Sequence, residues 1–207
     1  MDFAFTEDQI SVRDLAEKIF RDRVQDNYWS DTFNEAEPFD KALWATLVET
    51  GMTGIALPAA YGGSEMGFIE LCLLLEAQTQ FLAPVPLFAA NILSGLPIAE
   101  FGTEDQKSAY LCGITDGSKL VTAAVGDMFL SGAEAIVFAE ETHEGWELNG
   151  ALDNVAYGVE ADAVLIPAHT KNGISIFIVS SEAEGFLFEL QEGMSCDPLA
   201  RLTLKNV

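Results

Sequence analysis

The chain has 207 residues, of which 49% are hydrophobic and 21% are charged, a balance typical of a globular protein rather than a disordered one. Its 33 acidic residues outnumber its 10 basic residues, so the formal net charge is -23. This excess repels phosphate backbones and anionic membrane surfaces, which excludes nucleic acid and membrane lipid as expected partners.

The cysteines and histidines do not form a recognisable site. Cys72, Cys112 and Cys196 are odd in number and far apart, without a CxxC pair, so neither a disulfide framework nor a zinc site is predicted. Cys72 lies within an apolar run and is predicted to be a small core residue. His143 and His169 stand beside turn-like residues and are predicted to lie on surface loops.

The amino terminus shows no targeting pattern. No basic region is followed by an apolar run, and no apolar stretch of the sequence is long enough to span a bilayer. We therefore expect a cytoplasmic protein.

Two helices are predicted in the first fifty residues. Thr6 and Gln9 form a capping box at the start of the first helix, which carries an approximate apolar stripe. Pro38 suits the first turn of the second helix, and Gly51 ends it.

A glycine loop then leads into a longer apolar helix. Residues 58–64 read Pro-Ala-Ala-Tyr-Gly-Gly-Ser, in which adjacent glycines free the backbone for a tight turn. Residues 68–75 are apolar nearly all round, which predicts a helix buried in the centre of a bundle and stopped by Pro84 and Pro86. A further helix is predicted over 88–96.

The last helix of this region begins at a second capping box. Gly102 suits the end of the preceding helix, and Thr103 with Gln106 caps the next one, which contains Tyr110 and Leu111.

The hydrophobic period changes after residue 115. Short runs rich in β-branched and aromatic residues predict seven strands, with turns at Asn149-Gly150 and at 171–173. The strands are predicted over 120–125, 135–138, 145–148, 163–167, 174–179, 186–190 and 202–207. Helices followed by strands indicate an α+β protein: a helical bundle domain over 1–116 and a small antiparallel β-barrel or sandwich over 117–207.

Several motifs, in this order and spacing, resemble the amino-terminal and middle domains of acyl-CoA dehydrogenases. They occupy residues 1–9, 39–44, 58–63, 102–111, 149–150, 161–168 and 173–179. The resemblance covers almost the whole chain and implies a helical domain followed by a β domain. In this family a carboxy-terminal helical bundle completes the fold, and FAD lies between the β domain and that bundle.

The resemblance also implies a chemistry. A glutamate of the bundle removes the α-proton of an acyl-CoA while hydride leaves the β-carbon for the flavin. No residue of these 207 matches that glutamate, so we predict no catalytic residue and no metal ligand here. Asp127 and Glu104 are the acidic residues nearest to recognisable motifs, and neither matches the base.

The first flavin-facing segment of the family corresponds here to Val125, Gly126 and Asp127. Typical members have a threonine at the position of Gly126 and a glutamate at that of Asp127. The resemblance therefore leaves backbone donors at Val125 and Gly126, with Asp127 as a possible stand-in for the glutamate, as the expected FAD contacts.

The second flavin-facing segment corresponds to residues 152–157. Asn154 replaces a tryptophan of the family, and Ala156 replaces a threonine. Backbone donors at Val155 and Ala156 remain as expected FAD contacts, whereas the side-chain contacts are gone. Farther on, residues 197–201 resemble an Asp-x-Thr-Arg-Arg motif, with Ala200 in place of the first arginine.

Such losses are a feature of family members that act in hetero-oligomers, including bacterial dehydrogenases of steroid side-chain CoA thioesters. The chain is thus interpreted as an acyl-CoA dehydrogenase-like protein, either a degenerate or a truncated subunit, with a homologous subunit or a second copy as its partner. The alternative is a non-catalytic subunit that completes a partner's pocket. Tyr61 has two interpretations, a lining of the acyl channel or a structural ring, and the pattern favours the second.

Overall fold

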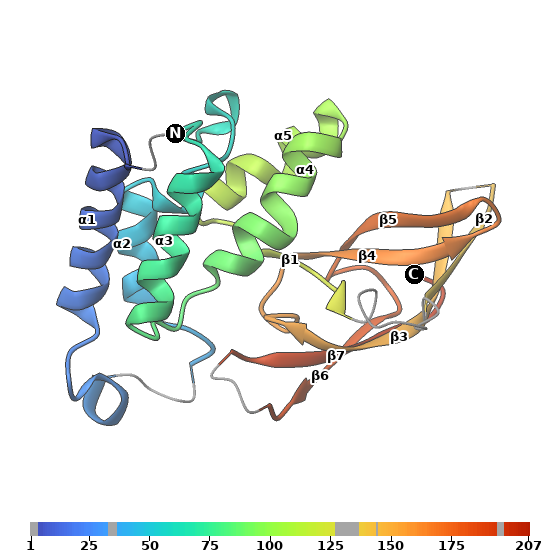
Figure 1. Cartoon of the computed structure of the whole chain (residues 1–207). Helices are drawn as coiled ribbons and strands as arrows, with labels where there is room; N and C mark the ends of the chain where they lie inside the picture. The colour runs from blue at the N-terminus through green and yellow to red at the C-terminus, as the bar shows by residue number, and fades with distance from the viewer. Residues whose placement is uncertain (1–3, 33–36, 127–136, 144, 194–196) are drawn as a thin grey trace. The chain divides into compact units, whose positions relative to one another are not determined.

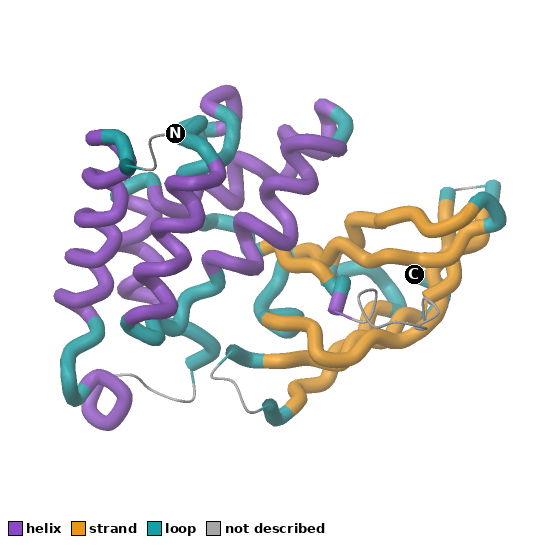
Figure 2. Tube along the Cα trace, in the orientation of Figure 1, coloured by secondary structure: helices purple, strands orange, loops and turns teal. Residues whose placement is uncertain are grey.

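The computed structural model describes residues 4–32, 37–126, 137–143, 145–193 and 197–207. These residues form two compact units, Met1–Ser118 and Lys119–Val207. The division falls two residues beyond the expected domain boundary. Figures 1 and 2 show helices throughout the first unit and the strands in the second.

The first unit contains five α-helices among its described residues, joined by short 3-10 and π segments. The α-helices are α1 (Glu7–Arg23), α2 (Lys41–Glu49), α3 (Phe68–Gln80), α4 (Leu96–Phe101) and α5 (Glu104–Thr115). The π segments are η1 (Tyr28–Thr32) and η4 (Phe88–Gly95), and the 3-10 segments are η2 (Met52–Gly54) and η3 (Ala59–Tyr61). None of the described helices is both long and apolar enough to cross a membrane.

Side chains start three of these helices. Both predicted capping boxes are confirmed: Thr6 with Gln9 at α1, and Thr103 with Gln106 at α5. The second helix begins later than predicted, because the Asp40 carboxylate accepts hydrogen bonds from the first amides of α2. Pro38 therefore lies outside the helix rather than in its first turn.

Helix α3 packs along α1 in the core of the helical unit (Figure 1). Leu71 and Leu74 are fully buried, but Phe68 is 61% exposed and Cys72 is exposed as well. The prediction of burial all round, with Cys72 in the core, is wrong. Because α3 also carries apolar residues on its exposed face, the sequence pattern does not show which face of the helix is buried.

The described strands of the second unit match the seven predicted ones in order. They are β1 (Val121–Ala123), β2 (Val137–Glu141), β3 (Trp146–Ala156), β4 (Ala163–Thr170), β5 (Gly173–Ser180), β6 (Phe186–Gln191) and β7 (Leu199–Leu204). The predicted turn at Asn149-Gly150 is wrong, because both residues lie inside β3, where Gly150 pairs with Val137 and Leu204.

The described strands form one mixed sheet in the order β1-β4-β2-β3-β7-β6, with β5 paired to β4. Most pairings are antiparallel, as predicted, but β1 and β2 each pair with β4 in parallel. Parallel pairing needs a long connection, and the chain between β1 and β4 supplies one by passing through β2 and β3. The composition of short strands does not predict this parallel pairing.

The sheet closes over a single apolar core. In Figure 1, β4 and β5 lie on one side of the unit and β3, β7 and β6 on the other. Side chains from both sides meet between them, including Val164 and Ile166 from β4 with Leu152 and Leu202 from β3 and β7. The arrangement resembles a small sandwich. It brings β1 and β3, whose ends carry the two expected flavin-facing segments, into contact.

Candidate functional site

The two segments expected to face a flavin lie at the ends of β1 and β3, and these two strands contact each other. The Thr122 hydroxyl of β1 donates a hydrogen bond of 2.9 Å to the carbonyl oxygen of Ala156, the last residue of β3. Just beyond β1, the Ala124 amide donates to the Leu165 carbonyl of β4. The structure thus brings together residues that are about thirty positions apart in the sequence.

In the first segment, Val125 is half-buried and Gly126 is exposed. No described atom lies within 4 Å of a Cβ built at Gly126, so the position is open. Asp127 lies outside the described residues.

In the second segment, Val155 is buried in the β core and pairs with Ala200, while Ala156 is half-buried and pairs with Leu199. The β3–β7 register shifts between Leu152 and Val155, which marks a β-bulge. Bulges re-aim the backbone next to functional sites in many proteins.

Gln191 holds the bulge from the end of β6. The Asn154 amide donates to Gln191 Oε1 at 2.8 Å, and Gln191 Nε2 donates to Asp153 Oδ1 at 3.0 Å. The Arg201 guanidinium of β7 lies 3.5 Å from the same Asp153 oxygen. The side chain of Gln191 therefore ties β6 to β3 through two hydrogen bonds.

Tyr157 anchors the far end of the segment. Its hydroxyl donates to Asp197 Oδ1 at 2.6 Å, and its amide donates to the Pro198 carbonyl at 2.8 Å. Asp197 and Arg201, both from the motif-like stretch, thus contact this segment through Tyr157 and Asp153 respectively.

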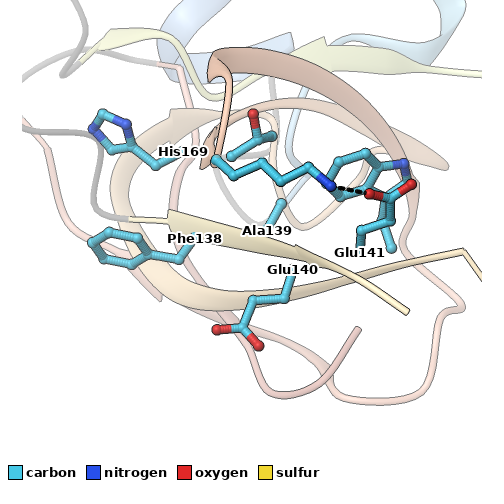
Figure 3. Close-up of a pocket in the computed structure, with 8 residues that line it drawn as sticks. Phe138, Ala139, Glu140, Glu141 and His169 are labelled. Atoms are coloured by element: carbon cyan, nitrogen blue, oxygen red, sulfur yellow. Dashed lines mark hydrogen bonds and ion pairs between the residues drawn. The ribbon is translucent and has the colours of Figure 1, made fainter. Parts of the chain in front are cut away.

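A second candidate lies between β2 and β4, in a notch of about 670 Å³ (Figure 3). The described residues pair these strands at one position, Phe138 with His169, and beyond it the strands part. The two rings stack with centroids 5.8 Å apart. The prediction of a surface loop is therefore wrong for His169, which lies on β4 and is half-buried.

An ion pair spans the notch. Lys171 lies 2.5 Å from the carboxylate of Glu141, and this hydrogen bond and charge lower the pKa of Glu141. The Glu140 side chain points away from the Glu141 side chain (Figure 3). The notch thus offers an aromatic surface, but its facing carboxylate is already paired. Among the described residues, no group of three His, Cys, Asp or Glu side chains could hold a metal ion.

The glycine loop of the helical unit is braced by Thr115. The Thr115 hydroxyl lies 2.8 Å from the Tyr61 carbonyl, and the Thr53 hydroxyl donates to the Thr115 carbonyl at 2.7 Å. The Tyr61 hydroxyl donates to Glu104 at 2.9 Å, a bond that lowers the pKa of this fully exposed carboxyl. Tyr61 thereby joins the loop to the first turn of α5.

The model of the family "Acyl-CoA dehydrogenase, N-terminal domain" matches residues 6–118, more than half of the chain. The chain belongs to the acyl-CoA dehydrogenase family.

Among curated relatives, the acyl-CoA dehydrogenase FadE27 of Mycobacterium tuberculosis is 30% identical over 186 residues, which are 89% of this chain and 49% of FadE27. The chain spans about half the length of the curated relatives that it matches.

Two solved structures share the fold; one is described as a complex and the other as a steroid acyl-CoA dehydrogenase. The ChsE4-ChsE5 complex from M. tuberculosis has a chain with a TM-score of 0.90 and 27% identity, covering 100% of this chain and 56% of that one. The Tcur3481-Tcur3483 steroid acyl-CoA dehydrogenase variant has a TM-score of 0.86 and 33% identity, covering 97% and 55%.

Acyl-CoA dehydrogenases use FAD, but the described residues of this member do not fit side-chain contacts to a flavin. Ala156 has no hydroxyl, and its carbonyl already accepts from Thr122. The Asn154 amide is taken by Gln191, and Gly126 offers no side chain.

Sequence reasoning did not find two residues of the β unit, Gln191 and Glu160, whose environments the structure shows. Gln191 carries no motif, and its position beside Asn154 follows from the β6–β7 register, which a sequence does not show. Glu160 follows β3 in a turn, and burial raises its pKa. Its Oε2 is buried without a hydrogen-bond partner among the described residues. A raised carboxyl pKa is one mark of candidate acid–base groups.

Proposed function

We propose that this chain forms the helical and β portions of an acyl-CoA dehydrogenase subunit that works in a heteromeric assembly in the bacterial cytoplasm. The observation that carries the proposal is the similarity of fold along the full chain to a subunit of the ChsE4-ChsE5 complex. The similarity to Tcur3481-Tcur3483, which is described as a steroid acyl-CoA dehydrogenase, supports the CoA thioester of a steroid side chain as the substrate.

A second candidate function is a non-catalytic subunit that completes a partner's pocket. The observation in its favour is the loss of side-chain donors at Gly126 and Ala156, together with the internal use of the Asn154 amide. In this version the partner holds the flavin, and this chain supplies shape and support.

In either function the partner subunit is expected to supply the base. An α-proton next to a thioester is weakly acidic, so a carboxylate must be held against it while the carbonyl oxygen is stabilised. The hydrogen bond from Tyr61 lowers the pKa of Glu104, which makes it a weaker base. Glu160 has the opposite shift, and it is therefore the residue to exclude by mutation.

Anaerobic mixing tests the proposal. The chain is combined with FAD and a panel of straight-chain, branched and steroid acyl-CoAs, alone and with a homologous subunit, while flavin absorbance is recorded. We expect bleaching with the partner and none with the chain alone, because general-base catalysis contributes about 10²- to 10⁴-fold and flavin orientation is missing as well. Bleaching by the chain alone that disappears in Glu160→Gln or Asp127→Asn would assign the base to this chain and overturn the proposal.

The isolated chain is also expected to purify without flavin. Each lost hydrogen bond to a buried group costs roughly 1–3 kcal/mol, and two side-chain donors and a stacking ring are replaced at Gly126, Ala156 and Asn154. An absorbance spectrum taken after gel filtration checks this. Stoichiometric flavin bands at neutral pH would contradict it.

A further inference from the structure

Two non-glycine residues, one in β3 and one directly after it, lie in the left-handed region. Asn154 has a φ of 58° and Tyr157 a φ of 56°. Such angles are uncommon outside glycine, and asparagine tolerates them better than tyrosine does. Two of them within four residues persist only where the surrounding structure holds the backbone in place.

Both left-handed residues are held from the same stretch of chain, the end of β6 and the start of β7. Gln191 accepts from the Asn154 amide at 2.8 Å, and Asp197 and the Pro198 carbonyl accept from the Tyr157 hydroxyl and amide. We call these three residues, Gln191, Asp197 and Pro198, the β3 clamp. Val155 and Ala156 lie between its two points of attachment.

Gln191 is itself oriented. Its Nε2 donates to Asp153 Oδ1 at 3.0 Å, so its Oε1 must face the Asn154 amide. The Arg201 guanidinium beside Asp153 adds an opposite charge on the same carboxylate. The amide of Asn154 is therefore satisfied by a side chain whose direction is fixed at its other end.

We propose that the β3 clamp holds the backbone of residues 153–157 in its bulged conformation without a flavin, with Gln191 as the positioning residue. The clamp makes this edge of the β unit a preformed surface whose backbone geometry does not depend on a cofactor. The inference rests on the proposed function, because the family resemblance is what identifies residues 152–157 as the flavin-facing segment.

Amide hydrogen exchange of the full chain, followed by NMR, tests the clamp at a single atom. In the unmodified chain without FAD, the Asn154 amide is expected to be protected. In Gln191→Leu it exchanges about tenfold faster, the factor that one ordinary hydrogen bond provides. Glu192→Gln, at the neighbouring exposed position, is the matched control and leaves the Asn154 rate unchanged. An Asn154 amide that is unprotected in the original chain overturns the proposal.

A double-mutant cycle separates positioning from general stability. Asp153→Ala frees the other end of Gln191, so it also speeds exchange at Asn154, whereas in the Gln191→Leu background it adds nothing further. Asp153→Asn keeps an acceptor oxygen and retains protection. Additive effects of Asp153→Ala and Gln191→Leu at Asn154, or equal acceleration of amides throughout the β core, contradict a positioning role.

The same NMR measurement with added FAD completes the test. At FAD in large excess, the Asn154 amide of the unmodified chain is expected to keep its chemical shift and its protection. A shift at Asn154 with altered protection would mean that flavin competes with Gln191, which overturns the proposal. The exchange rates measured without FAD report on the clamp alone. A chain that assembles with no dehydrogenase subunit would thus refute the proposed function and leave the clamp result intact.

Discussion

Asp40 is a buried charged side chain of the helical unit. It is 5% exposed, and its carboxylate accepts from Arg23 Nε at 2.6 Å, from the Tyr28 hydroxyl at 2.7 Å, and from the amides of Ala42 and Leu43 at 3.0 Å each. One side chain thus caps α2 and joins it to the end of α1 and to η1. A buried carboxylate is tolerated only when it is satisfied in this way.

Asp40→Asn is expected to destabilise the protein by about 2–4 kcal/mol, because it breaks a largely buried ion pair and points an amide donor at Arg23 or Tyr28. Urea unfolding followed by circular dichroism measures the change. Asp14→Asn is the matched control, since Asp14 pairs with Arg13 on the exposed surface and is expected to cost less than about 0.5 kcal/mol. Equal losses in the two variants would refute the role given to Asp40.

The same carboxylate predicts a pH dependence. Burial alone would raise the pKa of Asp40, but the hydrogen bonds from Arg23, Tyr28 and the Leu43 amide outweigh it and hold the pKa below its ordinary value. A folded-state pKa below the unfolded one stabilises the fold above the unfolded pKa of about 3.9, and this contribution is lost as the pH falls through the folded pKa.

We therefore expect the difference in unfolding free energy between the original chain and Asp40→Asn to be constant from pH 8 to pH 5 and to shrink below about pH 4. Taking the difference between the two proteins removes the titration of the other acidic residues. A gap that already closes near pH 6, or one that does not narrow between pH 5 and the lowest pH at which both proteins remain folded, would show that another group controls it.

At the scale of elements, the glycine loop depends on close backbone contacts. A Cβ at Gly63 would lie 2.1 Å from the Leu57 carbonyl oxygen, and one at Gly54 would lie 2.8 Å from the Thr115 side chain. The Gly63 amide also donates to Pro58 within the turn. The loop can fold against α5 because these positions lack side chains.

Gly63→Ala is expected to cost about 2–4 kcal/mol, since backbone rather than a flexible side chain must move. Gly126→Ala is the control: its Cβ would meet no atom of the described residues within 4 Å, so the change is expected to stay within about 0.5 kcal/mol. Thermal and urea unfolding of both variants provide the measurement. A neutral Gly63→Ala would show that the loop relaxes without cost.

At this scale, the features that the sequence predicted correctly are those that depend on residues close together in the chain. The capping boxes at Thr6 and Thr103 use residues three apart, and the strands follow from composition over five to eight residues, so both were found. The β3 bulge, the Gln191 contact and the parallel pairs of β4 depend on residues tens of positions apart. The π segment η4 was expected as an ordinary helix, because its side-chain pattern does not distinguish hydrogen-bond spacing.

At the scale of the whole molecule, charge and exposed apolar surface oppose each other. The formal net charge of -23 repels other copies, whereas large apolar side chains lie exposed on β2 and β5. Phe138 is 57% exposed, Ile174 51% and Ile176 54%, and His169 pairs with both Phe138 and Ile174 across neighbouring strands. Such contiguous apolar surface is uncommon on stable monomers.

The chain by itself is expected to associate with further copies or with a partner, and the association is expected to strengthen with salt. Raising the ionic strength shortens the Debye length from about 10 Å at 0.1 M to about 3 Å at 1 M, which screens the repulsion between acidic surfaces and leaves apolar burial in place. Light scattering at low and high salt measures the associated fraction.

Variants of the exposed apolar residues test which surface is responsible. Ile174→Thr with Ile176→Thr keeps strand propensity and is expected to reduce the associated fraction, whereas Phe101→Ser, at an 84% exposed position of α4, leaves it unchanged. A clean monomer at high concentration in 1 M salt, or association that disappears as salt is added, would show that apolar surface does not drive the contact.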